Sequence, residues 1–193
     1  MTRRALITGG AGFIAGHLAR ALAEDGWAVD LLDNFARGRD DLDLNALLSF
    51  PATRIIRVSM TDREAIGQCD TGYDVIFHFA AIIGVRHVLN RPFAVLRDNV
   101  EMTVNAIEMA RRQTALSRFV FASTSEVTAG ALAHMNAAIP TPEDIPLVLT
   151  DLGHPRTSYM LSKIYGEALC HQSGIPFTIV RPHNAYGPRM GMA

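Results

Sequence analysis

The sequence predicts an α/β fold, in which helices cover both faces of a parallel β-sheet. Six short apolar runs lie along the chain, and helical patterns separate most of them. The runs are continuously apolar, as expected for strands that are buried on both faces of a parallel sheet. The chain has 193 residues, of which 49% are hydrophobic. That is enough for one domain with a substantial core.

The six apolar runs give the expected strands. Each run is short and is followed by a turn signal or a helical pattern. In chain order the expected strands are residues 4–8, 28–33, 54–58, 75–81, 118–123 and 177–181.

Three stretches have apolar residues at helical spacing. They cover residues 13–26, about 92–113 and about 158–172. Residues 130–155 contain Pro140, Pro142, Pro146 and Pro155, and we expect them to form a loop. In a compact domain, a loop of this length is more often a functional lid than an unstructured connection.

The composition argues against several classes of partner. The 18 basic and 19 acidic residues give a formal net charge of -1, so no overall positive field attracts nucleic acid or an anionic membrane. The apolar runs are far shorter than the roughly 18 to 20 residues of a membrane span. We therefore expect a cytoplasmic protein. Cys69 and Cys170 lie far apart in the sequence, and we expect them to be free, buried thiols.

A glycine-rich turn follows the first expected strand. Gly9, Gly10 and Gly12 stand where that strand leads into a helix, which allows backbone amides to approach a pyrophosphate. Asp33 ends the next strand, where a carboxylate can accept hydrogen bonds from the ribose hydroxyls of NAD. A carboxylate repels the 2′-phosphate of NADP, although Arg37 or Arg39 could reach such a phosphate. The pattern favours NAD.

The use of lysine is unusual. Seventeen of the 18 basic residues are arginines, and Lys163 is the single lysine. A site that keeps lysine can need a compact ammonium group, which guanidinium does not supply. Tyr159 stands four residues earlier in an expected helix, so both side chains project from one face. Chance gives this spacing in only about 2% of arrangements, which favours a functional pair.

The glycine turn and the Tyr-Lys pair belong to a longer series of motifs. The series comprises residues 8–14 (TGGAGFI), 74–81 (DVIFHFAA), Asn99, 123–127 (STSEV), 159–163 (YMLSK) and 181–188 (RPHNAYGP). Read together, these motifs resemble the extended short-chain dehydrogenase/reductases, and specifically the NAD-dependent nucleotide-sugar epimerases and dehydratases. Two positions differ from the family pattern: Ala15 stands where a third glycine is usual, and Thr128-Ala-Gly follows Val127 where Tyr-Gly is common.

The resemblance implies a Rossmann-type, doubly wound parallel sheet and a role for each matched residue. It implies that Thr124, Tyr159, Lys163 and Glu126 are catalytic. It implies that Ser125, Asn184 and Arg189 bind the substrate. The implied NAD-binding residues are Gly9, Gly12, Phe13, Ile14, Asp33, Asn34, Asp62, Ala80, Ala81, Asn99 and Lys163. No metal is expected, and His78, which lies in an apolar strand, is expected to be a hydrogen-bonded core residue.

The chemistry explains why tyrosine and lysine are needed together. To act as a base near neutral pH, Tyr159 must lose about three units from a pKa of about 10, or about 4 kcal/mol. One ammonium group at about 5 Å supplies about 3 kcal/mol at an effective dielectric constant near 20. A positively charged nicotinamide adds to this. We therefore expect Lys163 to favour ionised Tyr159.

The expected reaction begins with oxidation of a nucleotide sugar to a 4-keto intermediate. Epimerisation, dehydration and decarboxylation all remain open as later steps, with a UDP-, GDP- or dTDP-sugar as substrate. Glu126 favours the last two, because they need a further acid or base. Two alternatives are an NAD-dependent ketoreductase with a non-sugar substrate and a non-catalytic dinucleotide-binding protein.

The resemblance also concerns the size of the protein. We expect residues 1–193 to be an NAD-binding Rossmann domain that carries the catalytic residues. Members of the family continue into a smaller C-terminal substrate domain, which is absent from this sequence, and we expect the chain to be truncated. The family also implies a homodimer, which uses the helices near residues 92–113 and 158–172.

Overall fold

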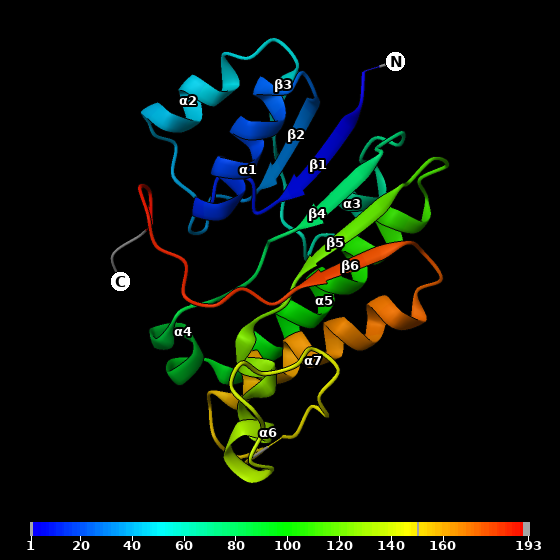
Figure 1. The fold of residues 1–193 in the computed structure, drawn as a ribbon. Helices are drawn as coiled ribbons and strands as arrows, with labels where there is room; N and C mark the ends of the chain where they lie inside the picture. The colour runs from blue at the N-terminus through cyan, green and yellow to red at the C-terminus, as the bar shows by residue number, and fades with distance from the viewer. Residues whose placement is uncertain (1, 150, 191–193) are drawn as a thin grey trace.

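The computed structural model describes residues 2–149 and 151–190, and it contains one parallel sheet of six strands. The strand order is β3-β2-β1-β4-β5-β6, as Figure 1 shows. All neighbouring strands are parallel, as the sequence predicts. The strands are β1 (Arg4–Thr8), β2 (Ala28–Asp33), β3 (Thr53–Arg57), β4 (Val75–His78), β5 (Arg118–Ala122) and β6 (Phe177–Val180).

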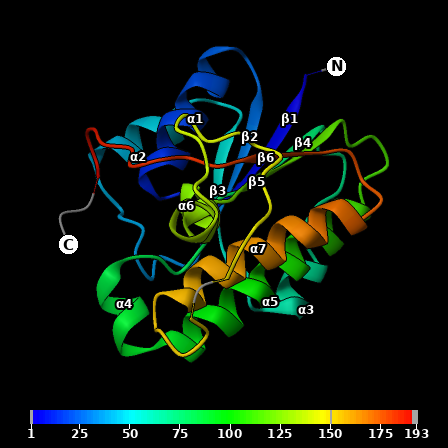
Figure 2. The same cartoon turned by 60° about the horizontal axis from the view of Figure 1, so that its bottom comes forward.

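Helices cover both faces of this sheet. α1 and α2 pack against one face, and α3, α5 and α7 pack against the other. Figure 2 shows α5 and α7 side by side on the second face. The helices are α1 (Phe13–Glu24), α2 (Leu42–Leu48), α3 (Arg63–Gly67), α4 (Val85–Asn90), α5 (Pro92–Arg111), α6 (Ala129–His134) and α7 (Thr157–Gln172), and a 3-10 helix, η1, covers Ser125–Thr128.

The core has two layers because alternate strand residues face opposite sides of the sheet. Ile7 and Leu31 face α1 and α2, whereas Leu6 and Ile76 face α5 and α7. All four side chains are fully buried. This pattern explains why the strands are continuously apolar in the sequence.

Residues at the N-termini of several helices determine where these helices begin. The carboxylates of Asp41 and Asp62 accept hydrogen bonds from the amides of Leu44 and Ala65, and so cap α2 and α3. Pro92 begins α5, where its missing amide hydrogen leaves no intrahelical bond unmade.

The strand order creates a switch point between β1 and β4. The chain leaves β3 at one side of β1 and returns on the other side as β4. In open α/β sheets, ligands bind at such a point, outside the carboxyl ends of the strands. The glycine turn after β1 and residues Ala80 and Ala81 after β4 lie there. The fold therefore places the predicted cofactor residues at the expected edge.

Most predicted elements agree with the structure, and the differences are local. β4 ends at His78 rather than at residue 81, because the amide of Ala80 donates to the side-chain oxygen of Thr8 and leaves the ladder. The predicted loop 130–155 was wrong at its start, since α6 extends to His134. Gly130 packs against the carbonyl group of Val148, so this helix is held against the later loop.

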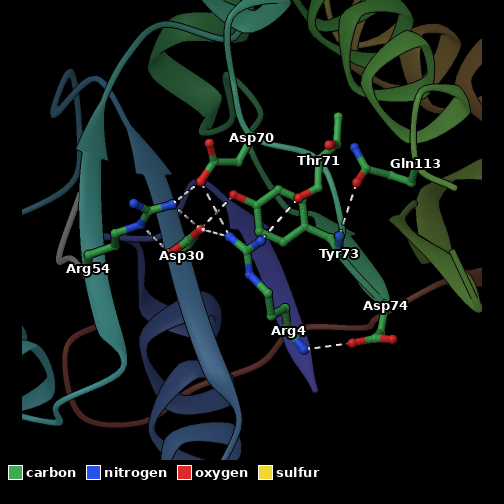
Figure 3. A network of polar contacts seen from close by, with 8 residues as sticks. All are labelled: Arg4, Asp30, Arg54, Asp70, Thr71, Tyr73, Asp74 and Gln113. Carbon is green, nitrogen blue, oxygen red and sulfur yellow. Dashed lines mark hydrogen bonds and ion pairs between the residues drawn. The ribbon is translucent and has the colours of Figure 1, made fainter. Parts of the chain in front are cut away.

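A network of charged residues lies toward the amino ends of the strands, at the opposite edge of the sheet. The Asp30 carboxylate in β2 is 5% exposed and accepts from Arg54 at 2.7 and 2.9 Å and from the Tyr73 hydroxyl at 2.5 Å. Figure 3 shows Arg4 and Asp70 completing the network. It joins β1, β2 and β3 to the loop before β4.

Both cysteines are free thiols, as predicted. Cys170 is fully buried in α7, and burial raises its pKa to about 12. Cys69 is only half-buried, so the expectation of a buried thiol was wrong for this residue. Within residues 2–149 and 151–190, no helix has the length and apolar character needed to cross a membrane.

Candidate active site

The turn between β1 and α1 is built from glycines for steric reasons. Gly9 has a φ angle of +70°, and a Cβ atom there would lie 2.9 Å from the backbone nitrogen of Ala80. At Gly12, the N-cap of α1, a Cβ atom would lie 3.0 Å from the carbonyl oxygen of Gly9. Gly12 also brings no side chain to cap the helix. The turn therefore presents backbone amides and the positive end of the helix dipole, a suitable place for a pyrophosphate.

Asp33 lies beside this turn, at the end of β2. One carboxylate oxygen accepts from the amide of Ala11 at 3.0 Å, and the other accepts from the amide of Phe35 at 2.7 Å. Each oxygen has further acceptor capacity, as needed for ribose hydroxyls. The glycine turn and the carboxylate that the sequence pairs are thus in direct contact.

Three further predicted residues meet at the carboxyl end of β5. Lys163 and Tyr159 project from α7, and Thr124 stands two residues after the end of β5. The ammonium nitrogen of Lys163 is 2.7 Å from the carbonyl oxygen of Ala122 and 5.8 Å from the centre of the Tyr159 ring. Gly166 makes this close packing possible, because a Cβ atom there would collide with the Phe121 ring. The predicted catalytic residues therefore lie together.

The pKa values of Tyr159 and Lys163 both differ from the ordinary values of these groups. Burial, followed by the negative charge of Glu126, raises the pKa of Tyr159 to about 12, while contact with the Thr124 hydroxyl opposes these effects. Burial lowers the pKa of Lys163 to about 8. The expectation that Lys163, beside a bound and positively charged nicotinamide, favours ionised Tyr159 stays a prediction.

Residues 5–193 match the NAD dependent epimerase/dehydratase family. The chain belongs to this family. The resemblance seen in the sequence motifs and the Rossmann-type fold are both confirmed.

Individual members of the family show which reactions it includes. A UDP-N-acetyl-alpha-D-glucosaminuronate decarboxylase of Bacillus cytotoxicus is 35% identical over 98% of the chain and 56% of that protein. A crystal structure of a UDP-galactose 4-epimerase has a TM-score of 0.77 and 33% identity over 97% of the chain and 58% of that structure. The Bordetella bronchiseptica enzyme WbmF in complex with NAD+ has a TM-score of 0.76 and 26% identity, over 97% of the chain and 51% of that structure. The chain thus spans about half the length of these relatives.

Glu126 lies close to α7, the helix that carries Tyr159 and Lys163. It belongs to η1, and its carboxylate is 3.9 Å from the guanidinium group of Arg156, just before α7. The Glu126 side chain is 44% exposed. A ligand or water can therefore reach this carboxylate, and its charge acts on Tyr159.

Asn99 organises the inner side of the site. Its buried side chain accepts from the amide of Ile82 at 2.7 Å and donates to the carbonyl oxygen of the same residue at 3.1 Å. It also donates to Ser162, one residue before Lys163. Asn99 therefore connects α5 to the segment after β4 and to α7.

The other predicted cofactor residues lie around the same edge. The amide of Ala80 donates to Thr8, and Ala81 is partly exposed beside it. Asn34 accepts from the amide of Ala36, next to Asp33. Asp62 is exposed and caps α3. Phe13 and Ile14 begin α1, and the Ile14 side chain is 47% exposed.

The three predicted substrate residues are spread along this edge of the sheet. Ser125 lies next to Thr124, and its amide donates to the carbonyl oxygen of Pro182. Asn184 is exposed after β6. Arg189 instead lies beside the glycine turn: it donates to the carbonyl oxygen of Ala11 at 3.5 Å, pairs with Asp41 at 3.1 Å and lies against Gly16 in α1. Figure 1 shows its segment, in red, running from β6 along the strand ends toward α2.

His78 is a hydrogen-bonded core residue, as the sequence indicates. Its ring nitrogens contact the hydroxyl groups of Thr8 and Thr103 at 2.8 and 3.3 Å. Burial lowers its pKa to about 3, so the ring is neutral. Within the described ranges, no group of three or more His, Cys, Asp and Glu side chains forms a potential metal site.

Sequence reasoning missed a buried ion pair behind the predicted catalytic residues. Glu167 in α7 is 4% exposed and accepts two hydrogen bonds from Arg181 and one from Ser123. A signal was available, since Glu167 stands four residues after Lys163 and eight after Tyr159, on the same helix face.

Proposed function

We propose that this chain is the cofactor-binding and catalytic part of an NAD-dependent enzyme that oxidises a UDP-sugar to a 4-keto intermediate. The observation that carries the proposal is the placement of two groups at one edge of the sheet. The glycine turn with Asp33 and the cluster of Thr124, Tyr159 and Lys163 both lie at the carboxyl ends of the strands. The choice of UDP rests on the names of the relatives.

The glycine turn and Asp33 fit NAD. The close packing at Gly9 and Gly12 leaves the turn free of side chains, and Asp33 offers a carboxylate rather than a cation to a ribose. NAD, when bound, supplies a ring that takes up a hydride and whose positive charge favours ionised Tyr159. In this proposal, the amides of the turn hold the pyrophosphate and Asp33 holds the ribose.

The catalytic cluster binds the 4-hydroxyl group of the sugar and removes its proton. Tyr159 accepts this proton as the carbon loses its hydride, which balances the oxidation of the alcohol to a ketone. The Thr124 hydroxyl holds the sugar oxygen, because it can both donate and accept. Lys163 keeps a positive charge behind the tyrosine and stabilises its ionised form.

Decarboxylation is the second candidate reaction, and Glu126 favours it. When the sugar carries a carboxylate at C5, oxidation at C4 produces a β-keto acid, which loses carbon dioxide with the ketone as electron acceptor. The carbon that is left then needs a proton, and Glu126 lies close enough to influence Tyr159. The relative from Bacillus cytotoxicus is named as a decarboxylase.

The proposal also includes the assembly and the compartment. A homodimer would use α5 and α7, which lie side by side on one face and carry the exposed apolar side chains of Phe93, Val104 and Tyr165. The two free thiols fit a reducing compartment, and we place the protein in the cytoplasm. Light scattering of the full-length protein tests the dimer.

The decisive experiment is product analysis. The full-length protein is incubated with NAD and, separately, with UDP-glucose, UDP-N-acetylglucosamine and their uronate forms, and products are followed by NMR. We expect conversion of at least one UDP-sugar without net accumulation of NADH. Release of carbon dioxide from a uronate identifies the decarboxylase. If NADH is consumed stoichiometrically with a non-sugar ketone while every UDP-sugar stays unchanged, the proposed function is wrong.

A further inference from the structure

The carboxylate of Glu167 accepts hydrogen bonds from three donor groups in the interior of the protein. The Ser123 hydroxyl donates to one of its oxygens, and Arg181 donates to both oxygens at 2.9 and 2.7 Å. The exposed fraction is 5% for the Glu167 side chain and 22% for the Arg181 side chain. This is a bidentate, largely desolvated ion pair, with a geometry that is specific in both distance and direction.

The partners of Glu167 enclose Thr124 along the backbone. The amide of Ser123 donates to the carbonyl oxygen of Val180, and the amide of Ser125 donates to that of Pro182. Thr124 stands between these two bonds on one side, and Arg181 stands between them on the other. Glu167 therefore connects both segments to α7, the helix that carries Tyr159 and Lys163.

Arg181 extends this connection to the loop before α7. Its remaining terminal nitrogen donates to the carbonyl oxygen of Glu143 at 2.8 Å. One guanidinium group thus joins the end of β6, the catalytic helix and the loop that the sequence marks as a lid. A movement of the Glu167 carboxylate changes all three contacts together.

Stability alone is a weak explanation for an ion pair in this position. A buried ion pair is often no more stabilising than apolar side chains of similar volume, because both charges must lose their water. What the pair supplies is a fixed direction for each hydrogen bond. Catalysis depends strongly on such placement, since an error of about 1 Å can reduce the rate about a hundredfold.

We propose that Glu167 is a positioning residue, which acts through Ser123 and Arg181 to fix the Thr124 hydroxyl relative to Tyr159. The role rests on the proposed function, since it concerns the same oxidation. Glu167 touches neither the sugar nor the cofactor in this role. Its effect is on the rate of the chemical step and not on substrate affinity.

The test compares Glu167→Gln with a matched control in the full-length protein. The control is Asp30→Asn, which removes a similarly buried carboxylate paired with Arg54 at the opposite edge of the sheet. We measure kcat, KM for the UDP-sugar, the Kd of NAD and the melting temperature. We expect Glu167→Gln to lower kcat roughly 10- to 100-fold, with KM and the Kd of NAD changed less than about threefold. Asp30→Asn should lower the melting temperature with kcat unchanged.

Ser123→Ala gives a second, milder variant if Glu167→Gln does not fold. It removes the hydrogen bond from the Ser123 hydroxyl to Glu167 and leaves the ion pair between Glu167 and Arg181 in place. We expect a kcat about 3- to 10-fold lower, again at constant KM. Where both variants fold, the double variant should lose less than the product of the two single effects, because the two groups act through one contact.

The outcomes separate this role from the proposed function. If the wild-type protein converts no UDP-sugar, the proposed function is wrong and the positioning role falls with it. If the wild-type protein is active but the variants lose no more kcat than Asp30→Asn, the function stands and the positioning role is wrong. A loss confined to KM also overturns the positioning role.

Discussion

The ammonium group of Lys163 binds the carbonyl oxygen of Ala122 at 2.7 Å and lies 5.8 Å from the centre of the Tyr159 ring. The lysine is therefore anchored to the last residue of β5. This anchoring fixes its position at the cost of burying a charge. Burial lowers its pKa from 10.5 to about 8.

The buried ammonium group makes stability depend on pH. Since the folded-state pKa is below the unfolded one, the unfolded chain binds the proton more tightly between pH 8 and 10.5, and stability rises with pH in this window. Relative to Lys163→Met, the wild-type protein should gain about 2 kcal/mol between pH 7 and 9.5. Urea unfolding at both pH values measures the difference. Arg111→Met, which removes an exposed cation, should show no such pH dependence.

Tyr159→Phe tests the assigned base. The phenyl ring keeps the packing of α7 but cannot accept the proton of the sugar hydroxyl. We expect the Kd of NAD to change less than about threefold, while turnover falls at least about a thousandfold, as for loss of a general base with its hydrogen bond. Isothermal titration and steady-state assays on the full-length protein provide both values. Undiminished turnover would show that Tyr159 is not the base.

Glu126→Gln should make Tyr159 easier to ionise. Burial is the main cause of the raised pKa of Tyr159, and the Glu126 charge is the second. Removing this negative charge lowers the pKa, so more phenolate forms at a given alkaline pH. Absorbance near 295 nm between pH 9 and 11 measures phenolate, and the same titration with Tyr159→Phe also present subtracts the other tyrosines. An unchanged difference would mean that the two groups are electrostatically independent.

The sequence predicted the six strands and the three longest helices, but it did not predict α2, α3, α4 or α6. The strands, the glycine turn and the contact between the turn and Asp33 follow from hydrophobic runs and fixed spacing, and the structure contains all of them. α6 was missed because the prolines that follow Gly130 suggested an irregular loop. The packing of Gly130 on Val148, which holds this helix, is a tertiary contact with no local signal.

The site was predicted less completely than the fold. Spacing on one helix was enough to pair Tyr159 with Lys163, but not to find that Lys163 bonds to Ala122. The cluster of Glu167, Ser123 and Arg181 joins three elements that are distant in the sequence. Such a cluster depends on the packing of α7 against β5 and β6. The helical spacing of Glu167 from Lys163 places it on the same face, but it does not indicate Ser123 or Arg181 as its partners.

Asp33→Asn should change the preference between the two dinucleotides. The amide side chain can still accept from Ala11, but it loses the charge that strengthens hydrogen bonds to the ribose hydroxyls. We expect the Kd of NAD to rise about 10- to 100-fold, while that of NADP changes less because the repulsion of its 2′-phosphate disappears. Titration calorimetry with both dinucleotides measures the ratio. Asp25→Asn, an exposed carboxylate at the end of α1, serves as the control.

The network around Asp30 gives the last prediction, which concerns stability alone. Burial and the neighbouring Asp30 charge raise the pKa of Tyr73, so its hydroxyl stays protonated and donates to Asp30. Tyr73→Phe should therefore cost about 1 to 2 kcal/mol, since it leaves a buried acceptor with one donor fewer. Asp30→Asn should cost about 2 to 3 kcal/mol, because Arg54 is half exposed and can partly hydrate when its partner is lost.

A double-mutant cycle of these two substitutions shows whether they act through one contact. We expect the combined loss in free energy of unfolding to be smaller than the sum of the single losses by about 0.5 to 1 kcal/mol, as for residues in one network. Urea unfolding at pH 7 measures all four proteins. Strict additivity would mean that the hydroxyl of Tyr73 contributes nothing through Asp30. The loop before β4 would then be held to β2 by its packing and by Arg4.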